Sequence, residues 1–166
     1  MTSCPSCNLQ VAAGSRWCGV CHANVVDSSV GRLASPGRRL AAHFCDLAIP
    51  AFALFTILGV AGAGLATGSD AGIGLGGLTA FVLFIAYIVW ALRLFSRGTT
   101  PGKNALGMRV VKESGSAAGF GTMLLREWIG KWLSSLVLGL GFLWILFDKD
   151  RQGWHDKLGS TYVVQS

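Results

Sequence analysis

The chain has 166 residues, of which 52% are hydrophobic and only 13% are charged. Soluble domains carry roughly 25% charged residues, whereas here the stretch from Leu47 to Leu92 contains a single charged side chain, Asp70. A soluble domain of this size needs more charged side chains on its surface than such a stretch provides. The composition therefore excludes a soluble globular enzyme, a disordered chain and a collagen-like repeat, and it predicts a small integral membrane protein with a membrane all-α fold.

The net charge of +6 is concentrated beside the apolar stretches. Residues 1–45 carry four arginines and one aspartate, residues 93–131 carry seven basic and two acidic side chains, and residues 148–166 are balanced. Positive charge that flanks apolar helices follows the positive-inside rule, and it suits anionic lipid headgroups. We therefore expect the lipid bilayer as a partner and no nucleic acid.

Four of the five cysteines lie near the N-terminus in two Cys-x2-Cys pairs, made by Cys4, Cys7, Cys18 and Cys21. Such pairs supply the four thiolates of a tetrahedral zinc site, and a segment of this size needs the metal to fold. Residues 1–26 are thus predicted to form a zinc ribbon with structural Zn²⁺, followed by a polar linker over 27–38. The alternatives are an iron site, a pair of disulfides, or a zinc site in which His22 is a ligand in place of Cys21. A reducing cytoplasm disfavours the disulfides.

Two uncharged segments, Leu47–Ser69 and Ala71–Leu92, are each long enough to cross a bilayer. Their connection is short, so we expect a helical hairpin whose first helix begins near Arg38 or Arg39. Basic side chains stand at both outer ends of the hairpin, which places these ends in the cytoplasm and the Asp70 turn outside. The sequence thus predicts a multi-pass protein of the plasma membrane with a cytoplasmic N-terminus.

The remaining residues predict shorter elements. Thr100–Lys103 is expected to form a tight interfacial turn with a snorkelling lysine, and 119–131 an amphipathic helix. Trp132–Phe147 is an apolar run of about 24 Å as a helix, against a hydrocarbon core of about 30 Å, and it either spans or dips in and returns. Isolated strands are unstable, so pairing of 106–111 with 160–164 is expected and favours a cytoplasmic tail.

One face of the first helix carries Arg39, His43 and Asp46, at spacings of four and three residues. A carboxylate below the membrane interface costs roughly 2.5–3.5 kcal/mol at mid-helix and needs a partner or a cavity. Asp46 is either a proton or cation carrier with His43 as a shuttle, or a carboxylate anchored by an arginine for helix packing. A second polar cluster, either functional or simply solvated, is made in the tail by Asp148, Asp150, Arg151, His155 and Asp156. No nucleophile–base pair emerges, so we do not expect an enzyme.

Four segments resemble the RDD family of small bacterial membrane proteins. They are RRLAAHFCD at 38–46, TPGKNALGMRVV at 100–111, GFGTMLLRE at 119–127 and DRQGWHDKLGSTYVV at 150–164. The resemblance implies that residues 39–166 form an RDD-like transmembrane domain in the bacterial inner membrane. The zinc ribbon is an addition to this domain. It implies that the family's arginine is Arg39 and its aspartates are Asp46 and Asp156, and that transport of an unspecified ligand is the usual role.

These observations lead to two functional hypotheses. The first is a proton- or cation-linked transport or permeability component, acting as a homo-oligomer because two full helices enclose no roomy pathway. Its functional network would comprise Arg39, His43, Asp46, Arg126 and Asp156, with Asp156 paired to Arg39 or Arg126. The second is a membrane-anchored adaptor whose cytoplasmic zinc ribbon binds a protein partner.

Overall fold

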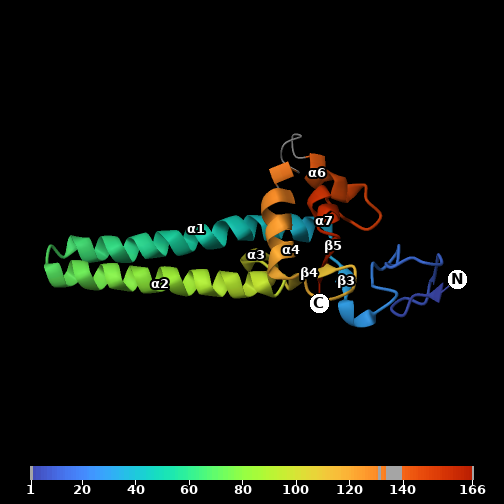
Figure 1. Cartoon of the computed structure of the whole chain (residues 1–166), viewed down its shortest axis with the longest axis horizontal. Coiled ribbons are helices and arrows are strands. Elements are labelled where there is room, and N and C mark those ends of the chain that lie inside the picture. The colour runs from blue at the N-terminus through green and yellow to red at the C-terminus, as the bar shows by residue number, and fades with distance from the viewer. Residues whose placement is uncertain (1, 131, 134–139, 166) are drawn as a thin grey trace.

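A computed structural model of the chain describes residues 2–130, 132–133 and 140–165. A long hairpin of two antiparallel helices, α1 (Pro36–Ala66) and α2 (Asp70–Ser96), projects from a compact end that holds the other elements (Figure 1). Both helices are long and apolar enough to cross a membrane, and the chain itself covers almost none of their apolar length. A core helix of a soluble protein would be covered, so this exposure fits a bilayer environment.

The predicted hairpin is confirmed, with its first helix starting slightly earlier than expected. Pro36 occupies the first turn of α1, and the Ser35 side chain caps the helix by accepting a hydrogen bond from the Arg38 amide. Near the hairpin turn the two helices touch through their backbones, because a Cβ added at Gly64 would lie 2.8 Å from Gly76 Cα. Glycine at these two positions thus allows the close contact of the helices.

A three-stranded antiparallel sheet lies at the open end of the hairpin. Its strands are β3 (Arg32–Leu33), β5 (Thr161–Gln165) and β4 (Met108–Lys112), in that spatial order. The predicted pairing of the central and C-terminal segments is confirmed, with Val110 opposite Val163. The C-terminal strand therefore lies at the same end of the hairpin as the residues that precede α1 (Figure 1).

Several short helices lie at the same end of the hairpin as this sheet (Figure 1). They are α3 (Pro101–Ala105), α4 (Phe120–Leu124), the π-helical turn η2 (Leu125–Gly130), α6 (Leu140–Leu143), the 3-10 turn η3 (Trp144–Leu146) and α7 (Trp154–Leu158). Helical structure is thus present where the amphipathic helix was expected, although it switches to a π-helical turn. Of the apolar run Trp132–Phe147, residues 134–139 lie outside the described residues, so the choice between a spanning and a returning path stays a prediction.

One local expectation at this end is wrong. Residues Pro101–Ala105 form α3, a single helical turn, where a tight interfacial turn was expected, but Lys103 is buried instead of snorkelling toward water. Arg126, which was expected to belong to the functional network, is 1% exposed and points into the protein. Both side chains turn inward because carboxylates lie there, as described below.

The N-terminal residues form a small module next to the sheet. Strand β1 (Thr2–Ser3) pairs with β2 (Gln10–Val11) in an antiparallel fashion. The 3-10 turn η1 (Ser28–Val30) and β3 follow within the segment predicted as a linker. Chain order and strand pairing thus connect this module directly to the membrane hairpin.

Candidate functional site

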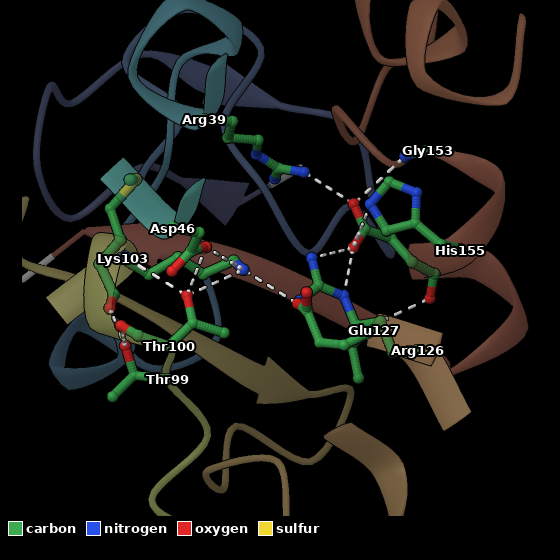
Figure 2. Close-up of polar contacts among 12 residues, drawn as sticks. Arg39, Asp46, Thr99, Thr100, Lys103, Arg126, Glu127, Gly153 and His155 are labelled. Atoms are coloured by element: carbon green, nitrogen blue, oxygen red, sulfur yellow. Dashed lines mark hydrogen bonds and ion pairs between the residues drawn. The ribbon is translucent and has the colours of Figure 1, made fainter. Parts of the chain in front are cut away.

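Asp156 on α7 is the centre of a buried polar cluster. Its side chain is fully buried, and it accepts hydrogen bonds from Arg39 Nη1 at 2.7 Å and from Arg126 Nε at 2.6 Å. Arg126 Nη2 lies 2.5 Å from the same carboxylate, and the Gly153 amide donates to it at 3.2 Å. Both guanidinium groups thus converge on this carboxylate, and Figure 2 shows Arg39, Arg126 and His155 around the contact. Asp156 therefore contacts both arginines that sequence reasoning offered as its partner.

The charges of this cluster stabilise one another. Burial alone would raise the pKa of Asp156, but Arg126, His155 and Arg39 outweigh it and hold the pKa well below its ordinary range. Burial alone would lower the pKa of Arg126, yet Asp156 and Glu127 raise it. Both groups are ionised at neutral pH, and removing either one would leave an uncompensated buried charge.

Asp46 on α1 is held by the segment that follows the hairpin. The Gly102 amide donates to Asp46 Oδ1 at 2.7 Å, and Thr100 Oγ1 donates to Oδ2 at 2.7 Å. Lys103 Nζ lies 3.7 Å from Oδ2. The cation that faces this carboxylate at ion-pair distance is thus a lysine rather than the arginine that the helix-packing alternative expected. Gly102 is required for this contact, because a Cβ there would lie 2.6 Å from the Asp46 amide nitrogen.

The two aspartates are connected through intervening ion pairs. Lys103 Nζ lies 2.9 Å from Glu127 Oε1, and the same oxygen lies 2.8 Å from Arg126 Nη1. We call the connected set the polar chain, which comprises Asp46, Lys103, Glu127, Arg126, Asp156 and Arg39 (Figure 2). Sequence reasoning missed Lys103 and Glu127 as members. Both lie within the segments that resemble the RDD family, which was the available signal.

A cavity of about 570 Å³ opens beside the polar chain. Arg39, His43 and Asp46 line it from α1, as their shared helical face predicts, and Asp46 keeps 15% of its side chain exposed. Its other walls contain the polar side chains Lys103, Arg126 and His155 and the apolar side chains Leu40, Leu143, Ile145, Leu146 and Val163. The cavity thus joins titratable groups of the membrane hairpin to those of the tail.

The N-terminal cysteines form a second candidate site. The sulfur atoms of Cys4, Cys7, Cys18 and Cys21 all lie within 4.8 Å of one another. The Cys4–Cys21 and Cys7–Cys18 separations are 3.5 and 3.6 Å, far from the roughly 2.05 Å of a disulfide. Four thiolates around one tetrahedral ion at about 2.3 Å would be about 3.8 Å apart, so the cluster fits a metal ion.

Backbone amides favour the thiolate form of Cys4 and Cys18, whereas burial and the neighbouring cysteine side chains raise the pKa of Cys7 to about 12. The amides of Cys21 and then Val20 lower the pKa of Cys18 to about 6, although burial opposes the shift. The Ser6 amide likewise lowers the pKa of Cys4. With four protein ligands the site would be closed, which is typical of structural metal sites.

The cysteine module packs against the sheet of the membrane domain. Trp17, next to Cys18, shares a buried cluster with Leu33 and Val164, and its ring lies 5.2 Å from that of Tyr162. His22 is not part of the four-sulfur cluster, and its Nε2 lies 2.6 Å from Arg151 Nη2. The cysteine module therefore packs against the strand that carries Tyr162.

The polar residues of the tail do not gather at one point. Asp148 pairs with Lys157 at 2.5 Å, and Arg151 contacts the N-terminal module. Only His155 and Asp156 belong to the cavity or the polar chain, with His155 Nε2 3.5 Å from Asp156 Oδ1. The tail therefore supplies one buried carboxylate to the site rather than a cluster of its own.

Comparison with known proteins identifies the family of the chain. Residues 33–160 match the RDD family, which covers well over half of the chain. The chain belongs to the RDD family. Arg39, Asp46 and Asp156, which the resemblance singled out, thus all lie within the matched domain, and the cysteine module precedes it. No solved structure matches the chain.

Several curated proteins are similar to part of the chain. A proline-rich antigen homolog of Mycobacterium tuberculosis is 34% identical over 83 residues, which are 48% of this chain and 34% of that protein. The proline-rich antigen of Mycobacterium leprae is 31% identical over 88 residues, 51% of this chain and 35% of its own length. Protein YckC of Bacillus subtilis is 32% identical over 90 residues, 49% of this chain and 60% of its own length. The matches thus span less than two thirds of each relative.

Proposed function

We propose that this RDD protein is a proton- or cation-linked transport or permeability component of the plasma membrane. The supporting observation is that Asp46 and His43, on a helix able to cross the bilayer, line one cavity with Lys103 and Arg126. A carboxylate at membrane depth, partly exposed to a cavity, is typical of proton and ion pathways.

The geometry supports a proton more directly than a metal ion at Asp46. Both carboxylate oxygens already accept short hydrogen bonds, from Gly102 and Thr100, and Lys103 lies beside them. A metal cation would have to displace these donors and approach a lysine, whereas a proton adds to an oxygen in place. Protonation of Asp46 would loosen its contact with Lys103 and leave that lysine paired with Glu127.

Transport requires an assembly, because two membrane helices do not enclose a pathway. Large apolar side chains remain exposed along both α1 and α2, among them Phe52, Phe55 and Phe81. We propose that part of this surface contacts other copies of the chain and the rest contacts lipid. Cross-linking in native membranes should give a discrete homo-oligomer, and a monomer at all concentrations would contradict the assembly.

The functional test is proton flux into liposomes that contain the purified full chain and a pH-sensitive dye. We expect proton flux under an imposed pH gradient, measured with and without Na⁺ or K⁺ on the opposite side of the membrane. Proton flux should be lost in Asp46→Asn. Asp70→Asn is the matched control, because Asp70 is an exposed carboxylate at the other end of the hairpin. Normal flux in Asp46→Asn would overturn the carrier role.

An adaptor role is the second candidate, favoured by the position of the cysteine module. We propose that its ion is zinc and that its exposed surface binds a protein partner while Trp17 attaches it to the membrane domain. Elemental analysis should find one zinc per chain, and stoichiometric iron would contradict this assignment. Loss of cellular function in a Cys4→Ser chain that still inserts and still conducts protons would favour the adaptor.

A further inference from the structure

The cavity beside the polar chain carries an excess of positive charge. The side chains of Arg39, Lys103 and Arg126 line it, whereas Asp46 is the only carboxylate in its lining among the described residues. The other two carboxylates of the polar chain, Glu127 and Asp156, lie behind this surface, with 7% and 0% of their side chains exposed. Three cationic side chains and one carboxylate therefore line the cavity, so the formal charge of its lining is positive.

One donor in this lining lacks an acceptor. Arg39 has 91% of its side chain buried, and its Nη groups donate to Asp156 and to the Val163 carbonyl oxygen. Its Nε has no hydrogen-bond partner among the described residues. An unmet buried donor is unfavourable, and Arg39 lines the cavity, so an acceptor bound there beside the guanidinium would satisfy it. An anionic oxygen would meet both this donor and the positive charge.

The opposite wall of the cavity is apolar and open. Leu40, Leu143 and Leu146 line it and are each more than half exposed. Leu40 lies in the second turn of α1, so this wall is continuous with the exposed apolar surface of the membrane helix. A ligand in this position needs an anionic head against Arg39 and an acyl chain along the leucines. The cavity volume lies within the range of about 300–1,000 Å³ that small-molecule pockets occupy.

We propose that this cavity binds an anionic phospholipid from the surrounding leaflet, with the phosphate facing Arg39 and an acyl chain lying along Leu40, Leu143 and Leu146. The negative head group offsets the excess positive charge that faces Asp46. This lipid site goes beyond the proposed proton-linked function. Lipid binding can be measured without a pH gradient, so its test is separate from the flux experiment.

Native mass spectrometry of the purified full chain in detergent micelles tests the site. Phosphatidylglycerol and phosphatidylcholine with the same acyl chains are added at equal concentration, and bound lipid is counted. Both lipids carry a phosphate, but phosphatidylcholine adds a choline cation, which the basic side chains of the lining disfavour. We expect about tenfold more phosphatidylglycerol, because avoiding one such unfavourable charge contact is worth about this factor. Equal retention of the two lipids would overturn the proposal.

Two variants locate the binding in the cavity. Leu40→Glu places a negative charge on the exposed wall and should abolish the preference for phosphatidylglycerol, whereas Leu65→Glu, an equally exposed leucine at the other end of α1, should retain it. Arg39→Lys keeps the charge but removes Nε, and it should reduce the preference severalfold. An unchanged preference in folded Leu40→Glu and Arg39→Lys chains would overturn the proposal.

A soluble amphiphile and a free anion are the other sources of the same chemistry. Decyl phosphate and inorganic phosphate are therefore added as competitors at the concentration of phosphatidylglycerol. We expect neither to displace the lipid. Displacement by decyl phosphate would assign the cavity to a free amphiphile, and displacement by inorganic phosphate would assign it to a simple anion, and each result would overturn the phospholipid assignment.

Discussion

Replacing Asp156 by asparagine should be strongly destabilising. The side chain is fully buried. One of its oxygens lies 2.7 Å from Arg39 Nη1, and the other lies 2.6 Å from Arg126 Nε and 2.5 Å from Arg126 Nη2. Asparagine keeps the shape but removes the charge, and its amide group would face a guanidinium. Breaking a buried ion pair from one side costs about 3–5 kcal/mol. Here Arg39 loses its counter-ion, whereas Arg126 loses one of two carboxylates and keeps its ion pair with Glu127.

Thermal unfolding of the purified chain in detergent measures this cost. For a chain of this length 1 kcal/mol lowers the midpoint by about 2–4 °C, so a decrease on the order of 10 °C is expected. Asp70→Asn, at the exposed first turn of α2, is the control and should cost less than about 1 kcal/mol. A decrease for Asp156→Asn no larger than for Asp70→Asn would refute the reasoning.

The same variant carries a pH dependence with a defined sign. Because the pKa of Asp156 is lower in the folded chain, its stabilisation is complete above the unfolded value of about 3.9 and is lost as pH falls toward the folded value. Acidification from pH 6 to pH 3 should therefore lower the wild-type midpoint more than that of Asp156→Asn. Parallel curves for the two proteins would contradict an ionised, paired Asp156.

Three further outcomes follow from the geometry. Gly102→Ala should lower the unfolding midpoint by several degrees and impair proton flux, because the added Cβ would force α3 away from Asp46; unchanged stability and flux would contradict the close approach. Cys18→Ser should reduce the bound metal measured by elemental analysis, and full metal content would contradict a four-sulfur site. Trp17→Ala should cost about 3–5 kcal/mol in unfolding free energy because it empties the contact with Tyr162, and a change below 1 kcal/mol would show that the module is not docked.

Much of the fold could be predicted because a membrane restricts the structures that an apolar segment can form. In lipid every backbone polar group needs a hydrogen-bond partner within the protein, so two uncharged segments joined by a short turn are expected to form a helical hairpin. The β4–β5 pairing followed from two β-prone segments that needed a partner. By contrast, β3 has only two residues, Arg32 and Leu33, and so carries no recognisable alternation.

The site was only partly predictable, for a physical reason. Helical spacing placed Arg39, His43 and Asp46 on one face, and all three line the cavity. Lys103 was misjudged, because a basic residue after an apolar helix ordinarily snorkels to water. Its burial depends on Glu127, 24 residues away in sequence and 2.9 Å away in the fold. Such a pairing depends on the tertiary structure and cannot be recognised from a single sequence.

The most direct test of the account is proton flux in liposomes that contain equal amounts of the wild-type chain, Asp46→Asn and Asp70→Asn. The account predicts flux through the wild-type chain and Asp70→Asn and only background flux through Asp46→Asn, since Asp46 is the hairpin carboxylate that lines the cavity. Equal flux through all three chains, or none through the folded wild-type chain, would contradict it.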